Sequence, residues 1–380
     1  MFFRNLFNRP RETESNIAAK APKAPEPVQI QLLKEEGLIS NGREAWRVKA
    51  KKGVKPYDFI ATCIYNDMGR WRVMEATASL EEGTCKEIDI QKLLLYNGNV
   101  CFFIRYTFRS DDKYAFITCR KEGDRIRFSK QDLGRFCPEI LQCIDKNCSF
   151  VVIGNKLYGM KGYYCYCHDF VTGETKKVEI PSSEGSLWGV FYYNGYLYTG
   201  DRFVCDKVYR LDLANPEKSE GIDLKNVSSR SWPYQWDENN FIYKNRIYSR
   251  KGDLNYLDLN VMEFDMQTYS GGLVFLGMVS DRYLLVSNDT DTNQVVRGYS
   301  LYDLEENQRI MFDKKRFQCK DLKDPDKKVM IAVKNVVYIG ETAIFFYTKG
   351  KRVKEVFYSA VPFRELKDGT AAVVDFEIVI

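Results

Sequence analysis

The sequence predicts an all-β fold, and three observations support this prediction. Aromatic residues make up 14% of the 380 residues, with 25 Tyr and 24 Phe, and these types suit the pleated, half-buried surface of a sheet. From Val28 onward, short runs of alternating apolar and polar residues are separated by clusters of Gly, Asn, Asp and Ser, as in strands joined by turns. A strand motif that contains Tyr also recurs along the chain, which indicates a repeated unit.

The repeat consists of a Tyr-containing strand followed by a strand that ends in Asp. The Tyr motif occurs as NKLY (155–158), GYLY (195–198), NRIY (245–248) and NVVY (335–338), with DRYLLV (281–286) as a degraded copy. The Asp that follows is expected to be Asp169, Asp212, Asp265 and Asp303 in successive units. At the end of a strand, Asp can accept hydrogen bonds from backbone N–H groups of the next turn.

Each repeat therefore predicts a small antiparallel sheet of about four strands, with about 40 to 53 residues between successive Tyr markers. Such a sheet cannot bury both of its faces alone, but copies arranged around an axis bury each face against a neighbour. The sequence predicts a β-propeller of four-stranded antiparallel blades. We expect seven blades, with six as the alternative, because strand-like segments also occur at 44–76, 93–119 and 354–361.

The chain divides into two parts in this interpretation. Residues 1–27 are expected to form a flexible, disordered N-terminal tail, because AAKAPKAPEP (18–27) alternates Ala, Pro and Lys. Residues 28–380 are expected to form the propeller, and the strand-like segments 28–33 and 371–380 are available to close the ring. Within the tail, Phe2, Phe3, Leu6 and Phe7 would share one face of a short helix, so the tail is either a membrane-touching element or, as we favour, a frayed terminus.

One short run resembles a reactive centre but predicts a strand. YYCYCHDF (163–170) contains two Cys, an Asp and His168, the single His of the sequence. Side chains alternate along a strand, so Cys165 and Cys167 face one side and His168 faces the other. The three side chains therefore cannot form a shared site, and we expect no metal and no cofactor. A short helix is expected at 138–146, in PEILQCIDK.

Two segments carry a family resemblance. NGYLYTGDRFVCDKVYRLDLANPEKS (194–219) resembles a kelch repeat, with matches at 197–198 and 209–213, and 155–174 matches in a similar way. The double Gly of the kelch pattern is absent, since Gly200 alone lies near that position, and the Trp that normally follows is absent too. The resemblance extends over about 147–310 and implies a propeller fold, but it implies no chemistry by itself.

Composition limits the classes of function. The net charge is +5, from 57 basic and 52 acidic residues, which is too balanced to indicate a nucleic-acid-binding protein. Eleven Cys are scattered without a CxxC motif, and the N-terminus lacks the apolar core of a secretion signal. These features predict free thiols and a cytoplasmic location.

The sequence shows no catalytic motif, so a binding role is favoured over an enzyme. It contains no GxSxG, phosphate-loop or HExxH motif. We therefore expect an intracellular, non-catalytic scaffold that binds a protein partner through loops on one face. A carboxylate-dependent propeller hydrolase, or a carbohydrate-binding module with its ligand in the central channel, is the alternative.

The best candidates for the interaction surface lie in two aromatic loops between repeats, SSEGSLWGVFY (182–192) and SSRSWPYQW (228–236). The predicted surface consists of Trp188, Arg230, Trp232, Tyr234 and Trp236. Exposed Trp, Tyr and Arg are enriched where proteins bind one another. The competing interpretation is that these Trp side chains fill gaps between blades. The oligomeric state has no signature in the sequence.

Overall fold

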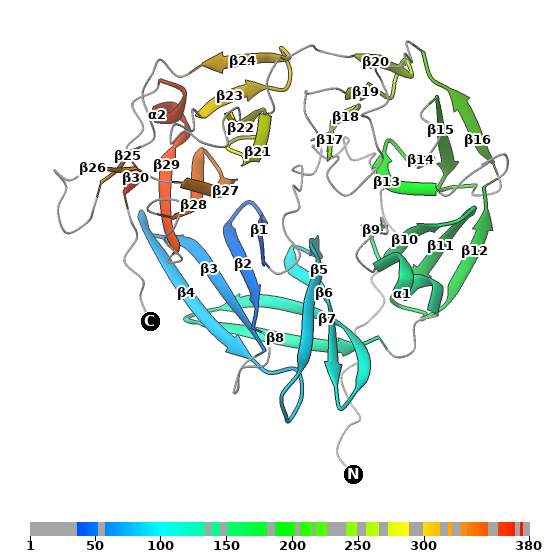
Figure 1. Ribbon diagram of the computed structural model, residues 1–380, viewed down its shortest axis with the longest axis horizontal. Helices are drawn as coiled ribbons and strands as arrows, with labels where there is room; N and C mark the ends of the chain where they lie inside the picture. Colours follow the sequence, from blue (N-terminus) through cyan, green and yellow to red (C-terminus); the bar gives the residue numbers. More distant parts are fainter. Residues whose placement is uncertain are drawn as a thin grey trace, which may run out of the picture.

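The computed structural model shows a ring of β-sheets around a common axis (Figure 1). The structure describes most of the chain from residue 36 to residue 374. The described ranges are 36–51, 58–133, 138–144, 150–180, 187–201, 206–215, 218–225, 241–248, 256–265, 273–288, 299–311, 318–320, 328–330, 332–348, 356–368 and 373–374. The predicted tail, residues 1–27, and the segment 28–33 lie outside these ranges.

The first four blades each contain four antiparallel strands in sequence order. Blade 1 contains β1 (Glu36–Ser40), β2 (Glu44–Ala50), β3 (Phe59–Asp67) and β4 (Arg70–Ala78), and blade 2 contains β5 (Lys86–Tyr96), β6 (Asn99–Phe108), β7 (Asp111–Glu122) and β8 (Arg125–Asp132). Blade 3 contains β9 (Phe150–Ile153), β10 (Lys156–Lys161), β11 (Tyr164–Asp169) and β12 (Thr175–Glu179), and blade 4 contains β13 (Leu187–Tyr193), β14 (Tyr196–Asp201), β15 (Lys207–Asp212) and β16 (Ser219–Asp223).

Three further blades complete the ring, which confirms the prediction of seven. Blade 5 contains β17 (Phe241–Tyr243), β18 (Arg246–Tyr248), β19 (Tyr256–Asp258) and β20 (Glu263–Asp265), and blade 6 contains β21 (Leu273–Met278), β22 (Tyr283–Asn288), β23 (Tyr299–Asp303) and β24 (Gln308–Met311). Blade 7 contains β27 (Ala332–Ile339), β28 (Thr342–Thr348) and β29 (Val356–Pro362) among the described residues. A small separate sheet contains β25 (Gln318–Lys320), β26 (Lys328–Met330) and β30 (Val373–Val374).

Two helices accompany the sheets in the part of the chain that the structure describes. The expected helix is present as α1 (Pro138–Ile144), which packs Ile140, Cys143 and Ile144 against blades 2 and 3. Close packing at α1 explains Gly159 in β10, because a Cβ atom there would lie 2.8 Å from the Cys143 sulfur. The second helix, α2 (Phe363–Lys367), follows β29.

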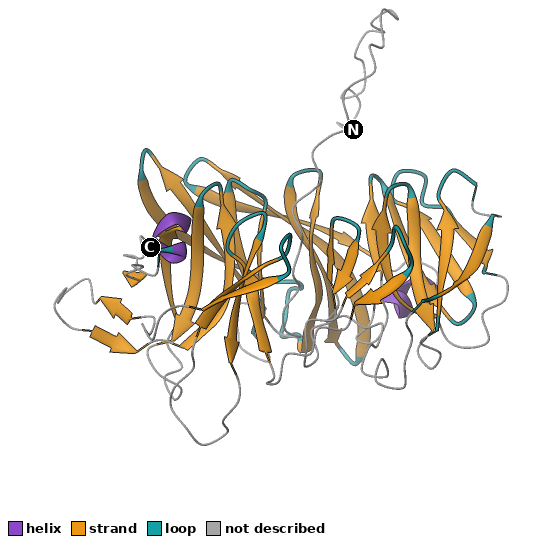
Figure 2. Cartoon of the chain, turned by 90° about the horizontal axis from the view of Figure 1, so that it is seen from above, coloured by secondary structure: helices purple, strands orange, loops and turns teal. Residues whose placement is uncertain are grey.

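The two faces of the ring differ in the length of their connections. Strands within a blade are antiparallel, so the turns between first and second strands and between third and fourth strands lie on one face, which we call the short-turn face (Figure 2). These turns contain two to six residues. The strand ends that are joined by blade-to-blade connections, or by the turns between second and third strands, lie on the opposite face, the long-loop face. Its connections contain 17 residues between β8 and β9 and again between β16 and β17, and 20 residues, β25 and β26 included, between β24 and β27.

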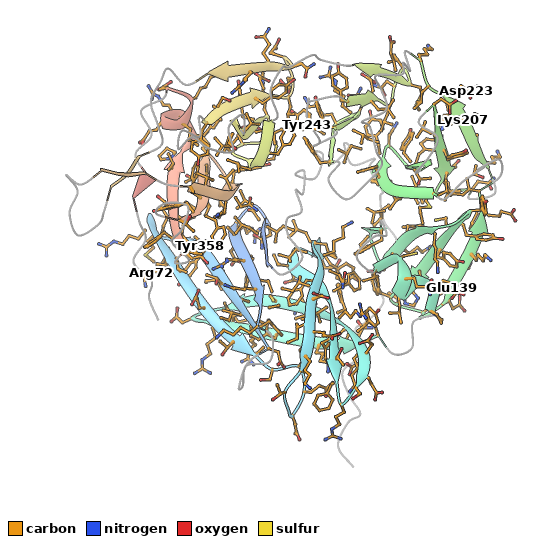
Figure 3. The ribbon with its side chains drawn as sticks, in the orientation of Figure 1. Arg72, Glu139, Lys207, Asp223, Tyr243 and Tyr358 are labelled. Carbon is orange, nitrogen blue, oxygen red and sulfur yellow. The ribbon has the colours of Figure 1, made fainter. Side chains whose placement is uncertain are left out.

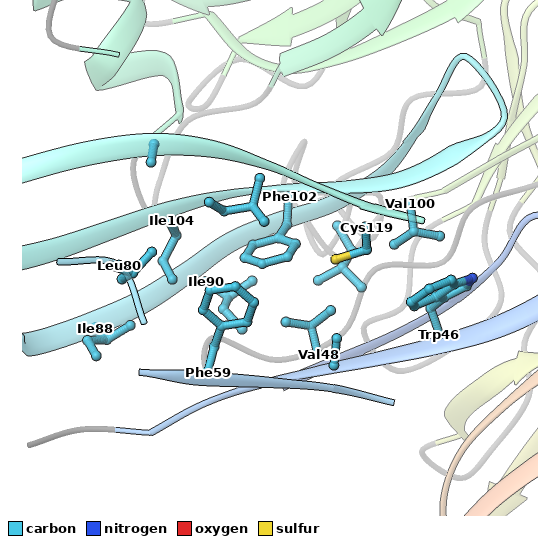
Figure 4. Packing of buried hydrophobic residues seen from close by; sticks show 14 of the residues in the cluster. Trp46, Val48, Phe59, Leu80, Ile88, Ile90, Val100, Phe102, Ile104 and Cys119 are labelled. Carbon is cyan, nitrogen blue, oxygen red and sulfur yellow. The ribbon is translucent and has the colours of Figure 1, made fainter. Parts of the chain in front are cut away.

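Side chains fill the space between neighbouring blades (Figure 3). The described residues form seven clusters of buried apolar side chains, and each cluster joins two adjacent blades. Between blades 1 and 2, Trp46, Val48 and Phe59 meet Phe102 and Ile104 (Figure 4). Phe59 and Phe102 pack edge to face, with ring centres 5.4 Å apart. Each sheet thus buries its two faces against different neighbours, which is the physical basis on which the fold was predicted.

Side chains join the first blade to the last. The cluster at this junction contains Leu38 and Ile64 of blade 1 with Ile344 of blade 7. Arg47 of β2 lies in the same junction, where it donates a hydrogen bond of 2.7 Å to the hydroxyl of Tyr358. Its guanidinium also lies 4.4 Å from the centre of the Phe346 ring.

The segments that we expected to close the ring give a mixed result. Residues 28–33 are outside the described ranges. In the C-terminal segment 371–380, Val373 and Val374 pair in parallel with Cys319 and Lys320 of β25. Among the described residues, the junction between blades 1 and 7 therefore consists of side-chain packing, with no strand shared between the two blades.

The repeat markers were predicted for five units, and they are confirmed in blades 3, 4 and 6 and wrong in part in blades 5 and 7. Asp169 accepts hydrogen bonds from the backbone N–H groups of Val171 and Thr172, as expected, and Asp303 accepts them from the turn that follows β23. In blade 5 the equivalent residue is Asp258, which ends β19 and accepts from the N–H of Asn260, whereas Asp265 ends the outer strand β20. Asp258 and Asp265 both follow an apolar residue and precede one, so the pattern did not distinguish them.

The second correction concerns blade 7. NVVY (335–338) was expected to mark the same strand as the other Tyr motifs, which lie in second strands. It lies instead in β27, the innermost strand, which runs beside β1 and β21. The second strand of this blade is β28, which carries Tyr347 near its end. Alternation alone does not tell which strand of a sheet faces the axis.

Candidate functional site

The predicted interaction surface lies mostly outside the described residues. Arg230, Trp232, Tyr234 and Trp236 belong to the connection between β16 and β17, of which residues 226–240 are not described. Trp188 lies in β13, where its backbone is paired with Gly200 of β14. The strands that border the two aromatic loops start or end at the long-loop face. The surface itself remains a prediction.

A β-bulge follows Trp188 in the innermost strand of blade 4. The pairing of β13 with β14 shifts register between Trp188 and Phe191, and Gly189 within this shift has a positive φ of 70°. A bulge inserts an extra residue, bends the strand and changes the direction of nearby side chains, and bulges are frequent next to binding sites. The start of β13 is therefore a local irregularity at the predicted surface.

Irregular innermost strands are a general feature of this ring. Register shifts also occur in β5, β21 and β27, so the described innermost strands of blades 2, 4, 6 and 7 contain bulges. Gly277 in β21 has a φ of 141°, and a Cβ atom there would lie 1.9 Å from the carbonyl oxygen of Val336 in β27. Sequence reasoning missed these bulges. Gly189 and Gly277 inside apolar runs were the available signal, because Gly within a strand indicates a bulge or a close backbone approach.

Lys92 lies on one of these bulged strands, β5, and the pKa of its side-chain amine is lowered. Its Nζ donates a hydrogen bond to the carbonyl oxygen of Phe150 in blade 3 and lies 4.3 Å from the centre of the Phe150 ring. Burial lowers the pKa of Lys92 to about 8. A lysine amine with such a pKa is suited to acid–base chemistry, but its described contacts are a backbone carbonyl and an aromatic ring. These contacts link the inner strands of blades 2 and 3.

Acidic residues are few on the described innermost strands. They occur as Glu36 in β1 and as Glu87 and Asp89 in β5, whereas β9, β13, β17, β21 and β27 carry none. A hydrolase that works through carboxylates needs two of them on opposite sides of the reacting bond. Within the described strands, carboxylates do not approach the axis from around the ring. The hydrolase or carbohydrate-binding alternative gains no support from this arrangement.

A charged cluster lies at the long-loop face between blades 1 and 2. Oε1 of Glu81 accepts hydrogen bonds from the Tyr106 hydroxyl at 2.8 Å and from the Nζ atoms of Lys113 and Lys130, both at 3.1 Å. Burial of Glu81 opposes its ionisation, but the hydrogen bonds from Tyr106, Lys130 and Lys113 outweigh this effect and lower the pKa to about 2.

The direction of these pKa shifts indicates a structural role. Burial acts to lower the pKa of Lys130, but the hydrogen bonds that its ammonium donates to Tyr106, Asp132 and Glu81 more than compensate and raise it. Glu81 and Lys130 therefore stay charged at neutral pH. A general acid or base needs a pKa near the working pH, so this cluster holds the connection between β4 and β5 in place instead.

The YYCYCHDF run forms β11, as predicted. Cys165 packs toward blade 4, whereas Tyr166 packs toward blade 2. His168 is buried and its Nδ1 lies 2.9 Å from the hydroxyl oxygen of Thr175. Seven Cys residues in the described ranges are free thiols, and burial raises the pKa of Cys101 to about 11 and that of Cys85 to about 12.

Two further features are absent from the described residues. No group of three or more His, Cys, Asp or Glu side chains in these ranges is arranged to hold a metal ion. Neither helix in the described part of the chain has the length and apolar character needed to cross a membrane.

Comparison with known protein families gave no assignment. No family model matches the sequence, and no curated protein matches it either. The kelch resemblance at 155–174 and 194–219 therefore has no support from a family model.

Solved structures resemble this chain at very low sequence identity. One is PorZ, described as an essential bacterial surface component of the type-IX secretion system of Porphyromonas gingivalis, with 10% identity and a TM-score of 0.47. That alignment covers 93% of this chain but spans 39% of PorZ.

Two other structures match over most of their own length. Virginiamycin B lyase from Staphylococcus aureus has 10% identity and a TM-score of 0.38, and the alignment covers 84% of this chain and 91% of the lyase. The computationally designed protein Ika8 has 8% identity and a TM-score of 0.42, with coverage of 88% and 97%. At these scores the matches carry no functional argument. The chain's own sheets establish what it is: a seven-bladed β-propeller.

Proposed function

We propose that this protein is an intracellular, non-catalytic propeller scaffold that binds a protein partner through loops of the long-loop face. The observation that carries the proposal is the difference between the two faces of the ring. The short-turn face has connections of two to six residues, whereas the strand ends at the long-loop face are joined by connections of up to 20 residues. Binding residues are found disproportionately on loops that a rigid scaffold positions, and seven packed blades are such a scaffold.

The residue types on the long-loop connections support binding of a protein. Trp188 lies at the start of β13, next to one connection, and Arg230, Trp232, Tyr234 and Trp236 belong to the connection between β16 and β17. Trp, Tyr and Arg contribute most often to the energetic centre of protein interfaces. Tyr163, in the turn between β10 and β11 on the same face, is 45% exposed.

The kelch-like segments agree with a scaffold without defining its family. The segment 194–219 contains the second and third strands of blade 4, and 155–174 contains the corresponding strands of blade 3. Both motifs supply strands and turns of the ring. Kelch membership is part of this proposal, and it rests on these motifs.

Affinity capture from cytosolic extract of the source organism tests the proposal. The bait is the full chain, compared with Trp232→Ala and Trp236→Ala variants, and bound proteins are quantified by mass spectrometry. Tyr192→Ala is the matched control, because Tyr192 is 41% exposed and lies near the short-turn end of β13. We expect at least one protein to be captured by the parent and the control and to be depleted severalfold by both Trp variants.

Circular dichroism and thermal midpoints show whether the variants keep the fold. If the Trp variants are folded and capture the same proteins at the same levels as the parent, the proposed surface is wrong. If they lose several kcal/mol of stability, the Trp side chains fill gaps between blades, which is the competing interpretation.

A further inference from the structure

Three donors from the sheet of blade 2 converge on one oxygen at the long-loop face. Tyr106 of β6 lies directly opposite Lys113 of β7. Lys130 of β8 is paired with Ile117, and Ile117 packs in the same buried cluster as Tyr106, between blades 1 and 2. Tyr106, Lys113 and Lys130, which we call the blade 2 cradle, therefore lie on one face of the sheet. The Tyr106 hydroxyl and the two Nζ atoms all donate to Oε1 of Glu81, at 2.8, 3.1 and 3.1 Å.

The acceptor comes from a different kind of element than the donors. Each cradle residue lies in a strand that is paired with its neighbours, so the sheet holds its backbone in place whether or not Glu81 is present. Glu81 lies in the connection between β4 and β5, which spans residues 79–85. The cradle is therefore a preorganised set of donors, and Glu81 is the carboxylate that fills it in the free protein. The same hydrogen bonds hold the connection in place.

The cradle carries two positive charges, and Glu81 supplies one negative charge. Lys113 and Lys130 both pair with the Glu81 carboxylate. Lys130 has a second carboxylate partner in Asp132, at 3.1 Å. For Lys113, Glu81 is the one carboxylate partner among the described residues. If Glu81 left the cradle, the Lys113 ammonium would have no anion, so the cradle is suited to another anion in the same place.

The cradle is partly open to solvent. The exposed fraction of the side chain is 38% for Lys113, 26% for Lys130 and 21% for Glu81. Phe108, at the end of β6, is half-buried beside the cradle, and its ring centre lies 5.0 Å from the Lys113 Nζ. A carboxylate that approaches from the long-loop face can therefore reach the ammonium groups, while Glu81 can turn toward water.

We infer that the blade 2 cradle binds an acidic side chain of a protein partner, and that Glu81 occupies the cradle as an internal competitor until the partner binds. This inference rests on the proposed scaffold role and gives its partner a chemistry. A carboxylate is the group that the cradle already holds. Exchange of one carboxylate for another keeps both ammonium groups paired, so it avoids the cost of a desolvated, unpaired charge. The competitor lowers the apparent affinity for the partner, because the cradle is free in a fraction of the molecules.

Peptide binding by fluorescence anisotropy tests this inference. The probe is a fluorescein-labelled peptide that alternates Glu with Ser and has an amidated C-terminus, and the comparison peptide has Gln in place of Glu. Glu81→Gln removes the charge of the internal competitor and should bind the acidic peptide about tenfold more tightly than the parent. Glu122→Gln is the matched control, because it makes the same charge change in the same blade while Glu122 pairs with Arg127. This control should bind like the parent, and Glu81→Gln combined with Lys113→Met should lose the gain.

Formate tests the cradle without a peptide. Glu81→Ala leaves the cradle empty, so we expect a lower thermal midpoint than that of the parent in sodium chloride. Formate that enters the empty cradle binds the folded state and should raise this midpoint. At about 100 mM formate and a dissociation constant of about 10 mM, the folding equilibrium shifts about tenfold. Sodium chloride at equal concentration controls for ionic strength, and the parent, whose cradle is filled, should respond less than Glu81→Ala.

Any of three results would overturn the inference. They are equal binding of the acidic peptide by Glu81→Gln and the parent, equal binding of the Gln and Glu peptides by Glu81→Gln, and equal midpoints of folded Glu81→Ala in formate and chloride. If Glu81→Ala does not fold, the peptide measurement on Glu81→Gln decides. The cradle takes no residue from the aromatic loops at 182–192 and 228–236. Failure of the cradle would therefore leave the proposed scaffold role standing, and capture with the Trp variants tests that role separately.

Discussion

The junction between blades 1 and 7 closes the ring, and Arg47 lies within it. Arg47→Met keeps most of the apolar stem but removes the guanidinium, with its 2.7 Å hydrogen bond to Tyr358 and its stacking on Phe346. A hydrogen bond from a charged donor contributes about 1.5–3 kcal/mol, and a buried cation–π contact contributes up to about 2 kcal/mol. After allowance for the favourable burial of Met, we expect a loss of about 2–4 kcal/mol in the free energy of unfolding.

Urea unfolding followed by tryptophan fluorescence measures this loss. Arg246→Met is the matched control at the junction between blades 5 and 6, where Arg246 donates to the Leu304 carbonyl at 3.2 Å and lies 4.6 Å from the centre of the Tyr256 ring. Arg246 is half-buried whereas Arg47 is 8% exposed, so the control should lose less.

Tyr358→Phe isolates the hydrogen bond. This variant leaves the Arg47 guanidinium in place without its hydroxyl acceptor, so we expect a loss of about 1–3 kcal/mol. Hydrogen exchange should show the largest increase in β2 and β29, which border the junction. A loss below about 0.5 kcal/mol in Arg47→Met, or a loss no larger than that of Arg246→Met, would refute the reasoning that Arg47 holds the ring closed.

Two further variants test other parts of the ring. Gly277→Ala places a Cβ atom 1.9 Å from the Val336 carbonyl oxygen at a φ of 141°, so we expect a loss above about 3 kcal/mol, whereas Gly195→Ala, at a φ of 84° with no atom within 4 Å, should lose about 1 kcal/mol in urea unfolding. Equal losses would show that the inner strands move apart easily. The pKa of Glu81 is lowered in the folded state, so its contribution to stability is complete above its ordinary value of 4.5 and disappears as the pH falls to about 2. Glu81→Gln should therefore have a lower urea midpoint than the parent at pH 7, and the difference should shrink on acidification from pH 4.5 toward pH 2; an unchanged difference would contradict this assignment.

The repeat pattern was sufficient to predict the fold because it depends on interactions between residues that are close together in the chain. Alternation of apolar and polar residues indicates strands, and NKLY and GYLY indicated where hairpins begin. Residues such as Asp169 and Asp303 cap turns with their own carboxylates, so their role is readable from neighbouring positions. Each sheet needs a neighbouring sheet on both sides to bury both of its faces. This requirement predicts a closed ring of sheets.

The errors occurred where several strands share one pattern. Asp265 was chosen over Asp258 because both fit the same local motif and the strands of blade 5 contain three residues each. NVVY was placed in a second strand because an inner strand has the same alternation as its neighbour. Their correct positions depend on which strand faces the axis, and contacts with distant strands decide this.

The candidate binding residues were identifiable from their types alone. Trp188, Arg230, Trp232, Tyr234 and Trp236 stand out because Trp and Arg are conspicuous in a loop. Contacts between blades were not identifiable in this way. Phe116 and Phe170 lie in ordinary strand and turn patterns, yet their rings stack and join blades 2 and 3.

The sequence by itself determined the strands, the turns and the need for each sheet to have two neighbours, because these follow from interactions between residues close together in the chain. Tertiary structure decided which strand lies nearest the axis, where the innermost strands bulge and how blade 1 meets blade 7. Arg47 and Tyr358 are 311 residues apart, so no local sequence pattern can predict the hydrogen bond between the Arg47 guanidinium and the Tyr358 hydroxyl.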